Sequence, residues 1–156
     1  EKKFSKMNIS EYIESENIVL DLKSKSKKNL LEFIAMKMSQ DHKVEKDIIF
    51  EKLYEREKLG TTGLGKGIAI PHARIPNTTE PKIVIIKLNA PLNYESIDGN
   101  DIDIVFALIV PEKEDSFQID LLSNIAAMLE DKSFLLDIRN STSKEEIKRH
   151  IQKFSH

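Results

Sequence analysis

Four of the five glycines of this 156-residue chain lie in one short loop, at positions 60, 63, 65 and 67. Glycine lets backbone N–H groups approach a phosphate closely. The stretch GTTGLGKG, which begins at Gly60, fits G-x-x-x-x-G-K, but Gly67 stands where a P-loop has a hydroxyl for Mg²⁺. Ile68 breaks the dinucleotide pattern G-x-G-x-x-G. The loop also leaves a predicted helix and enters a predicted strand, the reverse of a P-loop. We therefore do not expect nucleotide binding.

The loop leads to Pro71 and His72, which follow a short apolar strand at residues 68–70. A side chain at a strand end can be both fixed and accessible, and the rigid φ of Pro71 helps to aim it. A neutral imidazole has a lone pair near pH 7 and can act as a nucleophile. His72 can equally fill a hydrogen-bonding position at the strand end. The residues by themselves leave both roles open.

Other chemistries find no support in the residue types. The chain has no cysteine, which excludes disulfides and thiol chemistry. Its four histidines lack metal-ligand spacing, and no G-x-S-x-G nucleophile motif is present. We therefore predict neither a metal site nor a cofactor.

Charge and hydropathy limit the partners. The net charge of −2 is spread over both signs, and the basic run at 23–28 is typical of a solvated helix start. We therefore expect no nucleic-acid binding. The longest apolar run, 104–110, is far shorter than the roughly 20 residues that span a bilayer. No signal peptide opens the chain, so we expect a cytoplasmic protein with no direct membrane insertion.

The elements that must position His72 follow from periodicity. The sequence predicts strands at 16–22, 68–70, 82–88 and 101–110, and helices at 26–39, 45–58, 116–130, 133–139 and 144–153. Ser26 is the expected N-cap of the first helix, and Gly60 ends the second. This alternation predicts an α/β (or α+β) fold, with a central mixed sheet flanked by helices. We expect one domain over residues 1–156, with 1–7 as a flexible leader.

A longer pattern carries a family resemblance. Residues 55–73, EREKLGTTGLGKGIAIPHA, resemble the signature of the enzyme IIA components of the bacterial sugar phosphotransferase system, in the fructose/mannitol/nitrogen-regulatory class. Glu57, Leu64, Gly65 and residues 68–73 match its pattern. The likeness covers nearly the whole chain. It implies a phosphotransferase component in which His72 accepts phosphate from a phosphocarrier protein and passes it to a cysteine of a IIB partner, without nucleotide or metal.

The resemblance also implies a supporting site. Arg56 matches an arginine that lies near the phosphohistidine in this family, and a guanidinium can bind phosphoryl oxygens bidentately. Weaker candidates for phosphoryl contacts are the loop residues Thr61, Thr62, Gly63, Gly65 and Gly67. Lys66 is expected to be solvated.

One position departs from the family. A second histidine usually stands at the start of the helix after the VPE segment, and here that position is Gln118. Glutamine can donate through its amide, but it cannot titrate or carry positive charge. A place beside His72 and a place at a solvated helix start both remain open for Gln118.

The branch of the family decides the biological role. The stretches IPHAR and LNYESIDG favour a fructose-type domain for sugar uptake, reaching the membrane through fused or partner IIB and IIC modules. The alternative is a nitrogen-type regulatory protein whose phosphorylation state controls protein partners. A third reading, a degenerate IIA-like module, rests on Gln118.

Overall fold

One mixed sheet of six strands forms the centre of the protein in the computed structural model, which describes residues 8–113 and 116–154. The strands are β1 (Ile18–Leu22), β2 (Gly63–Gly65), β3 (Ile68–Ala69), β4 (His72–Ile75), β5 (Lys82–Leu92) and β6 (Ile102–Pro111). Their order is β1-β5-β6-β3-β2, and β4 also pairs with β6. β5 and β6 are antiparallel, whereas β1 runs parallel to β5, and β3 and β4 run parallel to β6. The expected mixed sheet is thus confirmed.

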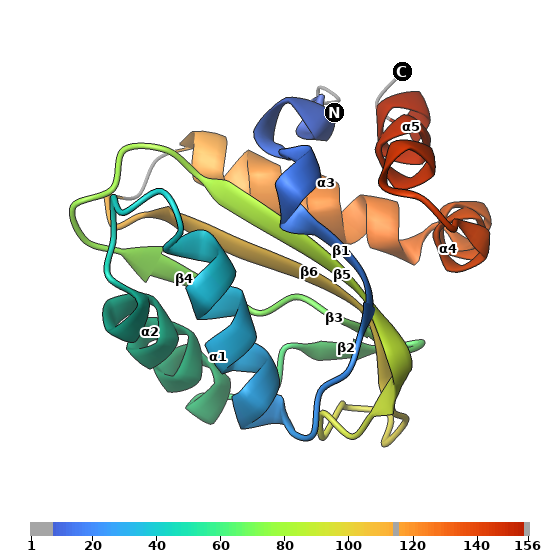
Figure 1. Ribbon diagram of the computed structural model, residues 1–156, viewed down its shortest axis with the longest axis horizontal. Coiled ribbons are helices and arrows are strands. Elements are labelled where there is room, and N and C mark those ends of the chain that lie inside the picture. The colour runs from blue at the N-terminus through green and yellow to red at the C-terminus, as the bar shows by residue number, and fades with distance from the viewer. Residues whose placement is uncertain (1–7, 114–115, 155–156) are drawn as a thin grey trace.

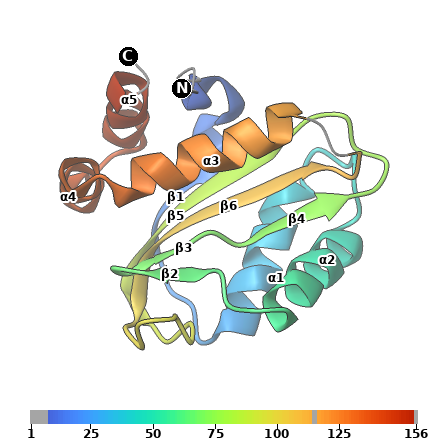
Figure 2. The same cartoon turned by 180° about the vertical axis from the view of Figure 1, so that it is seen from behind.

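Helices cover both faces of the sheet, as Figures 1 and 2 show from opposite sides. One face carries α1 (Lys27–Met38) and α2 (Lys46–Lys58). The other carries α3 (Ser116–Glu130), α4 (Lys132–Asn140) and α5 (Lys144–Phe154), together with the short 3₁₀ helix η1 (Ile9–Tyr12), and η2 (Ser15–Asn17) leads into β1. In the described part of the chain, no helix is long and apolar enough to cross a membrane.

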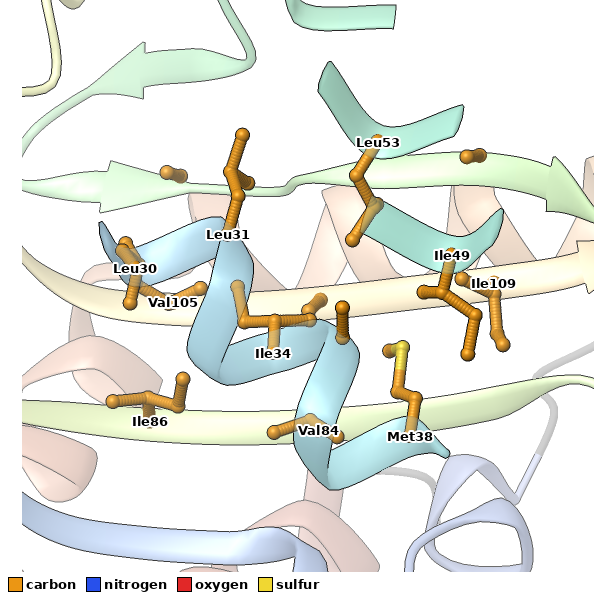
Figure 3. Packing of buried hydrophobic residues seen from close by; sticks show 14 of the residues in the cluster. Leu30, Leu31, Ile34, Met38, Ile49, Leu53, Val84, Ile86, Val105 and Ile109 are labelled. Atoms are coloured by element: carbon orange, nitrogen blue, oxygen red, sulfur yellow. The ribbon is translucent and has the colours of Figure 1, made fainter. Parts of the chain in front are cut away.

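Two hydrophobic cores result from the alternation of side chains along the central strands. Val84, Ile86 and Val105 face α1 and α2 (Figure 3). Their neighbours Ile85 and Ile104 face α3 to α5. The sequences of β5 and β6 are therefore nearly continuous apolar runs, as expected for strands that are buried on both faces.

The helices and four of the strands lie close to the predicted ranges. The Ser26 side chain accepts a hydrogen bond from Asn29 N at 3.0 Å, as expected for an N-cap. The sequence analysis missed β2 and β4, which lie within segments expected to be a loop and a strand end. The expected leader at 1–7 lies outside the described residues.

Pro71 separates two strands that share one partner. β3 and β4 both pair in parallel with β6, and the Pro71 carbonyl accepts a hydrogen bond from Leu108 N at 2.9 Å. Proline has no N–H to donate, so it interrupts the ladder locally. His72 therefore begins a new strand and pairs with Leu108. The sequence analysis had placed it just beyond the end of a strand.

Candidate active site

The ring of His72 is fixed by one hydrogen bond to the backbone. Its Nδ1 lies 2.7 Å from the carbonyl oxygen of Ile70, two residues earlier. A carbonyl oxygen can only accept, so Nδ1 carries the proton and the lone pair lies on Nε2. The hydrogen bond to Ile70 thus selects the tautomer that can attack through Nε2.

The environment keeps this imidazole neutral. Burial lowers the pKa of His72 below its usual value, and the positive charge of Arg56 acts in the same direction. The hydrogen bond to Ile70 and the charge of Glu57 oppose this shift without cancelling it. A neutral ring near pH 7 is the form that has a lone pair to donate.

His72 lines a pocket of about 440 Å³ at the side of the sheet where β4 lies. Its lining residues belong to α2 and the residue after it, β4, β6 and α3: Lys52, Glu55, Arg56, Leu59, His72, Ala73, Arg74, Leu108, Val110, Gln118, Ile119 and Leu122. Three cationic side chains and one carboxylate make the lining net positive. Leu59 and Ile119 are 84% and 53% exposed. The pocket therefore combines a net positive charge, which suits an anionic group, with exposed apolar side chains.

Arg56 and Gln118 reach this pocket from opposite faces of the sheet. Arg56 lies in the last turn of α2, and its Nη1 donates to the Gly60 carbonyl at 2.9 Å. Gln118 lies in the first turn of α3, is 8% exposed and donates from Nε2 to the Lys113 carbonyl at 2.7 Å. The structure thus brings three residues from the sequence analysis, His72, Arg56 and Gln118, to one pocket.

The five loop candidates are placed elsewhere. Thr61, Thr62, Gly63, Gly65 and Gly67 are not among the described residues that line the His72 pocket. Gly63 and Gly65 form β2, which pairs with β3, and the φ of +81° at Gly67 closes the turn between these strands. Thr62 is buried, and its hydroxyl donates to Glu57 at 2.6 Å. Phosphoryl contacts from these five residues stay a prediction.

The glycine at position 67 serves the hairpin turn. A Cβ at Gly67 would lie 2.6 Å from Arg139 Nη2 and 2.7 Å from Asp103 Oδ1. Arg139 forms an ion pair with Asp103 and also donates to the Lys66 carbonyl. Lys66 itself is exposed, as expected. The loop is thus tied to α4 and β6 by contacts that glycine permits.

The sequence analysis did not identify two cationic residues that line the pocket, Lys52 and Arg74. Arg74 lies two residues after His72 in β4, so both side chains point to the same face of the strand. Lys52 lies one helical turn before Arg56 on α2. Arg74 could have been identified if residues 72–75 had been recognised as a strand, because its side chain would then lie on the same face as that of His72. Among the described residues, no group of three His, Asp or Glu side chains is arranged to hold a metal ion.

Solved structures identify the fold. The crystal structure of nitrogen regulatory protein IIA-Ntr from Neisseria meningitidis superposes with a TM-score of 0.87 at 32% sequence identity, covering 92% of this chain and 98% of that one. The fold and the histidine pocket thus define a IIA domain of the phosphotransferase system.

The family follows from the sequence. Residues 11–154 match the family described as phosphoenolpyruvate-dependent sugar phosphotransferase system, EIIA 2, and the chain belongs to this family. It is 39% identical over 145 residues to the nitrogen regulatory protein homolog of Haemophilus influenzae, covering 90% of this chain and 88% of that protein. It is 29% identical over 124 residues to the fructose-specific EIIABC component of Bacillus subtilis, covering 79% of this chain and 20% of that protein. Family membership implies a part in phosphoryl transfer, and these identities favour the nitrogen-regulatory branch over the fructose-type branch expected first.

Proposed function

We propose that this protein is a histidine phosphoryl carrier of the nitrogen-regulatory type, with His72 as the residue that is phosphorylated. The observation that carries the proposal is the hydrogen bond between His72 Nδ1 and the Ile70 carbonyl. It directs the lone pair of a neutral imidazole to Nε2, in a pocket with a net positive lining.

The transfer balances without a cofactor. The Nε2 lone pair attacks the phosphorus of a phosphohistidine on the phosphocarrier protein, an N–P bond forms, and the donor nitrogen leaves with the electron pair of the bond that breaks. Nδ1 keeps its proton and its bond to Ile70 throughout. Such a transfer depends on positioning and on charge stabilisation. The reverse attack by an acceptor nucleophile removes the phosphoryl group again.

Three cations stabilise the transferring group. Arg56 presents a guanidinium that can bind two phosphoryl oxygens in parallel, and Lys52 and Arg74 add positive charge from the same pocket. Gln118 is a neutral amide donor at the position of the family's second histidine, so it adds no titrating group. The positive charge in this pocket therefore does not depend on a second imidazole.

The regulatory branch is supported by the similarity to nitrogen regulatory proteins over nearly the whole chain. In this function, the phosphorylated form carries one more net negative charge than the free form as long as Nδ1 keeps its proton, because a dianionic phosphoryl group then stands on a cationic ring, and protein partners distinguish the two forms. The phosphocarrier protein supplies the phosphate, and we place the exchange in the cytoplasm.

Phosphorylation of His72 is tested directly. With enzyme I, phosphocarrier protein and phosphoenolpyruvate, the wild type should gain one acid-labile, base-stable phosphate by intact mass, and His72→Gln should gain none. His42→Gln, at an exposed histidine, is the matched control and should be labelled normally. An unlabelled wild type, under conditions that label a control IIA protein, would refute the carrier function.

The fructose-type function remains a second candidate because of the similarity to a fructose-specific component. The purified phosphoprotein should be mixed with a fructose IIB domain. Slow loss of phosphate, with partner binding that depends on the phosphorylation state, is expected for the regulatory function. Rapid transfer to the IIB cysteine would favour sugar uptake instead.

A further inference from the structure

Glu57 is a buried carboxylate to which the sequence analysis assigned no role. It is 7% exposed and accepts hydrogen bonds from three residues. Thr62 donates from N at 2.8 Å and from Oγ1 at 2.6 Å, Tyr94 from its hydroxyl at 3.0 Å, and Lys27 from Nζ at 3.1 Å. Burial by itself raises the pKa of Glu57, but the bonds from Thr62 and Lys27 outweigh it, so the pKa lies below the usual value. The carboxylate is therefore ionised in the folded protein.

These bonds lead to the ring of His72 through the backbone. Thr62 N donates to Glu57, and the Thr62 carbonyl accepts from Ile70 N at 3.0 Å. The Ile70 carbonyl in turn accepts from Nδ1 of His72 at 2.7 Å. The carboxylate thus fixes Thr62, Thr62 fixes Ile70, and Ile70 orients the ring.

A second set of contacts leads to the guanidinium in the pocket. Gly60 N donates to the backbone carbonyl of Glu57 at 3.2 Å, and the Gly60 carbonyl accepts from Arg56 Nη1 at 2.9 Å. Gly60 lies only two residues before Thr62, so the short segment 60–62 is held between the Glu57 carboxylate and this turn. The carboxylate therefore holds the Thr62 end of a segment whose Thr62 end leads to His72 and whose Gly60 end contacts Arg56.

We propose that Glu57 is the positioning residue of the phosphoryl-transfer site, holding the acceptor ring and the guanidinium in register through segment 60–62. The inference rests on the proposed carrier function of His72. Lys27 and Tyr94 enclose the Glu57 carboxylate. Both donate hydrogen bonds to it, and Lys27 Nζ, which comes from α1, also lies 4.5 Å from the centre of the Tyr94 ring. Glu57 touches neither the phosphoryl group nor the donor.

The experiment compares Glu57→Gln with Glu51→Gln, the same chemical change at an exposed position of α2. Single-turnover phosphorylation measures the maximal rate and the donor concentration that gives half of it. Nitrogen chemical shifts of the His72 ring report its tautomer in the unphosphorylated protein. We expect Glu57→Gln to lower the maximal rate by about 10- to 100-fold at an unchanged half-saturating concentration, and to mix the two tautomers. Glu51→Gln should match the wild type in both measurements.

A second pair of variants covers the case in which Glu57→Gln does not fold. Lys27→Met removes one donor to the carboxylate, and Lys28→Met makes the same change at an exposed neighbour in α1. Circular dichroism at the assay temperature selects the folded variants. We expect Lys27→Met to slow transfer and to mix the tautomers to a smaller extent than Glu57→Gln, with Lys28→Met unchanged.

The outcomes separate this inference from the proposed function. If the wild type takes phosphate on His72, and every folded Glu57 or Lys27 variant keeps the wild-type rate and tautomer, the positioning role is overturned and the carrier function stands. If the wild type takes no phosphate, the carrier function fails and the positioning role fails with it. Slower transfer with mixed tautomers in the Glu57 and Lys27 variants, but not in the Glu51 and Lys28 controls, supports both the carrier function and the positioning role.

Discussion

At His72, one backbone hydrogen bond determines which ring nitrogen can react. The Ile70 carbonyl accepts a hydrogen bond from the protonated Nδ1. Burial and the charge of Arg56 lower the pKa of the ring and keep it neutral. An unassisted exposed histidine has neither a fixed tautomer nor a fixed direction. The same charge of Arg56 that disfavours protonation of the free ring would attract the negative oxygens of the phosphoryl group that we propose for Nε2.

Arg56 is expected to contribute to transfer more than to folding. Arg56→Ala should slow phosphorylation of His72 by about 100-fold, as the loss of a charged donor at a transferring group commonly does. Arg56→Lys should recover only part of the rate, because an ammonium lacks the bidentate fork. Stopped-flow or quenched-flow transfer rates measure this, with exposed Arg149→Ala as the control. Wild-type rates in Arg56→Ala would remove Arg56 from the site.

The lowered pKa of His72 predicts a pH dependence of stability. Because the folded pKa lies below the unfolded value of about 6.5, the stabilising contribution is present above pH 6.5 and is lost as the pH falls through the folded pKa. The free energy of unfolding should therefore fall more between pH 7.5 and pH 5 in the wild type than in His72→Gln. Urea unfolding at both pH values measures the difference. Equal losses in the two proteins would contradict a lowered pKa.

At the scale of elements, the site depends on an interrupted strand. β3 and β4 follow one another along the same side of β6, with Pro71 between them. The two strands keep one register against β6, since Ile68 pairs with Ile104 and His72 with Leu108. Ile70 instead donates from N to the Thr62 carbonyl, and its own carbonyl accepts from the ring of His72. β4 then carries Ala73 into one core and Arg74 into the pocket.

The β2 edge packs closely against the segment after β5. A Cβ at Gly63 would lie 2.3 Å from Ser96 Oγ and 2.9 Å from Ser96 Cβ. Gly63→Ala should therefore destabilise the protein by about 1–3 kcal/mol, the usual range for overpacking. The same substitution should cost less in a Ser96→Gly background, because the obstructing side chain is gone. A double-mutant cycle by urea unfolding measures this, and identical costs in both backgrounds would rule out the clash as the cause.

At the scale of the whole molecule, the pocket joins the two helical layers. α2 belongs to one face of the sheet and α3 to the other, and β4 lies between them (Figure 2). Arg56 and Gln118 therefore share one pocket although 62 positions separate them in the sequence. A shift of either layer against the sheet changes the spacing of the site.

The two cores are expected to unfold together, because β5 and β6 contribute side chains to both. Ile34→Ala in the α1 layer and Ile125→Ala in the α3 layer should each cost about 2–5 kcal/mol. Each variant should still show one transition in urea when it is followed by circular dichroism and by tyrosine fluorescence. Separate transitions for the two signals would show that the layers unfold independently.

Local patterns in the sequence were sufficient for the helices, four strands and the Ser26 cap, but they left two roles open for His72. Periodicity and capping depend on residues a few positions apart, so they can be read without knowledge of tertiary contacts. The signature around residues 55–73 added the family, which the matches confirm. The strand that His72 opens was not recognised, because four residues with a proline before them carry too little periodicity.

Only the tertiary structure decided what surrounds the histidine. The partner of Nδ1, the place of Arg74 in the pocket and the bonds that enclose Glu57 all depend on the pairing of β4 with β6 and on the packing of α1 and α2. The packing of the glycine turn against Asp103 and Arg139 likewise joins segments that are far apart in the sequence. The sequence by itself therefore determined the family and indicated His72 as the candidate reactive group, together with its neighbours along the chain. Contacts between distant segments determined its orientation, its charge and its pocket, because these depend on distances that no local pattern encodes.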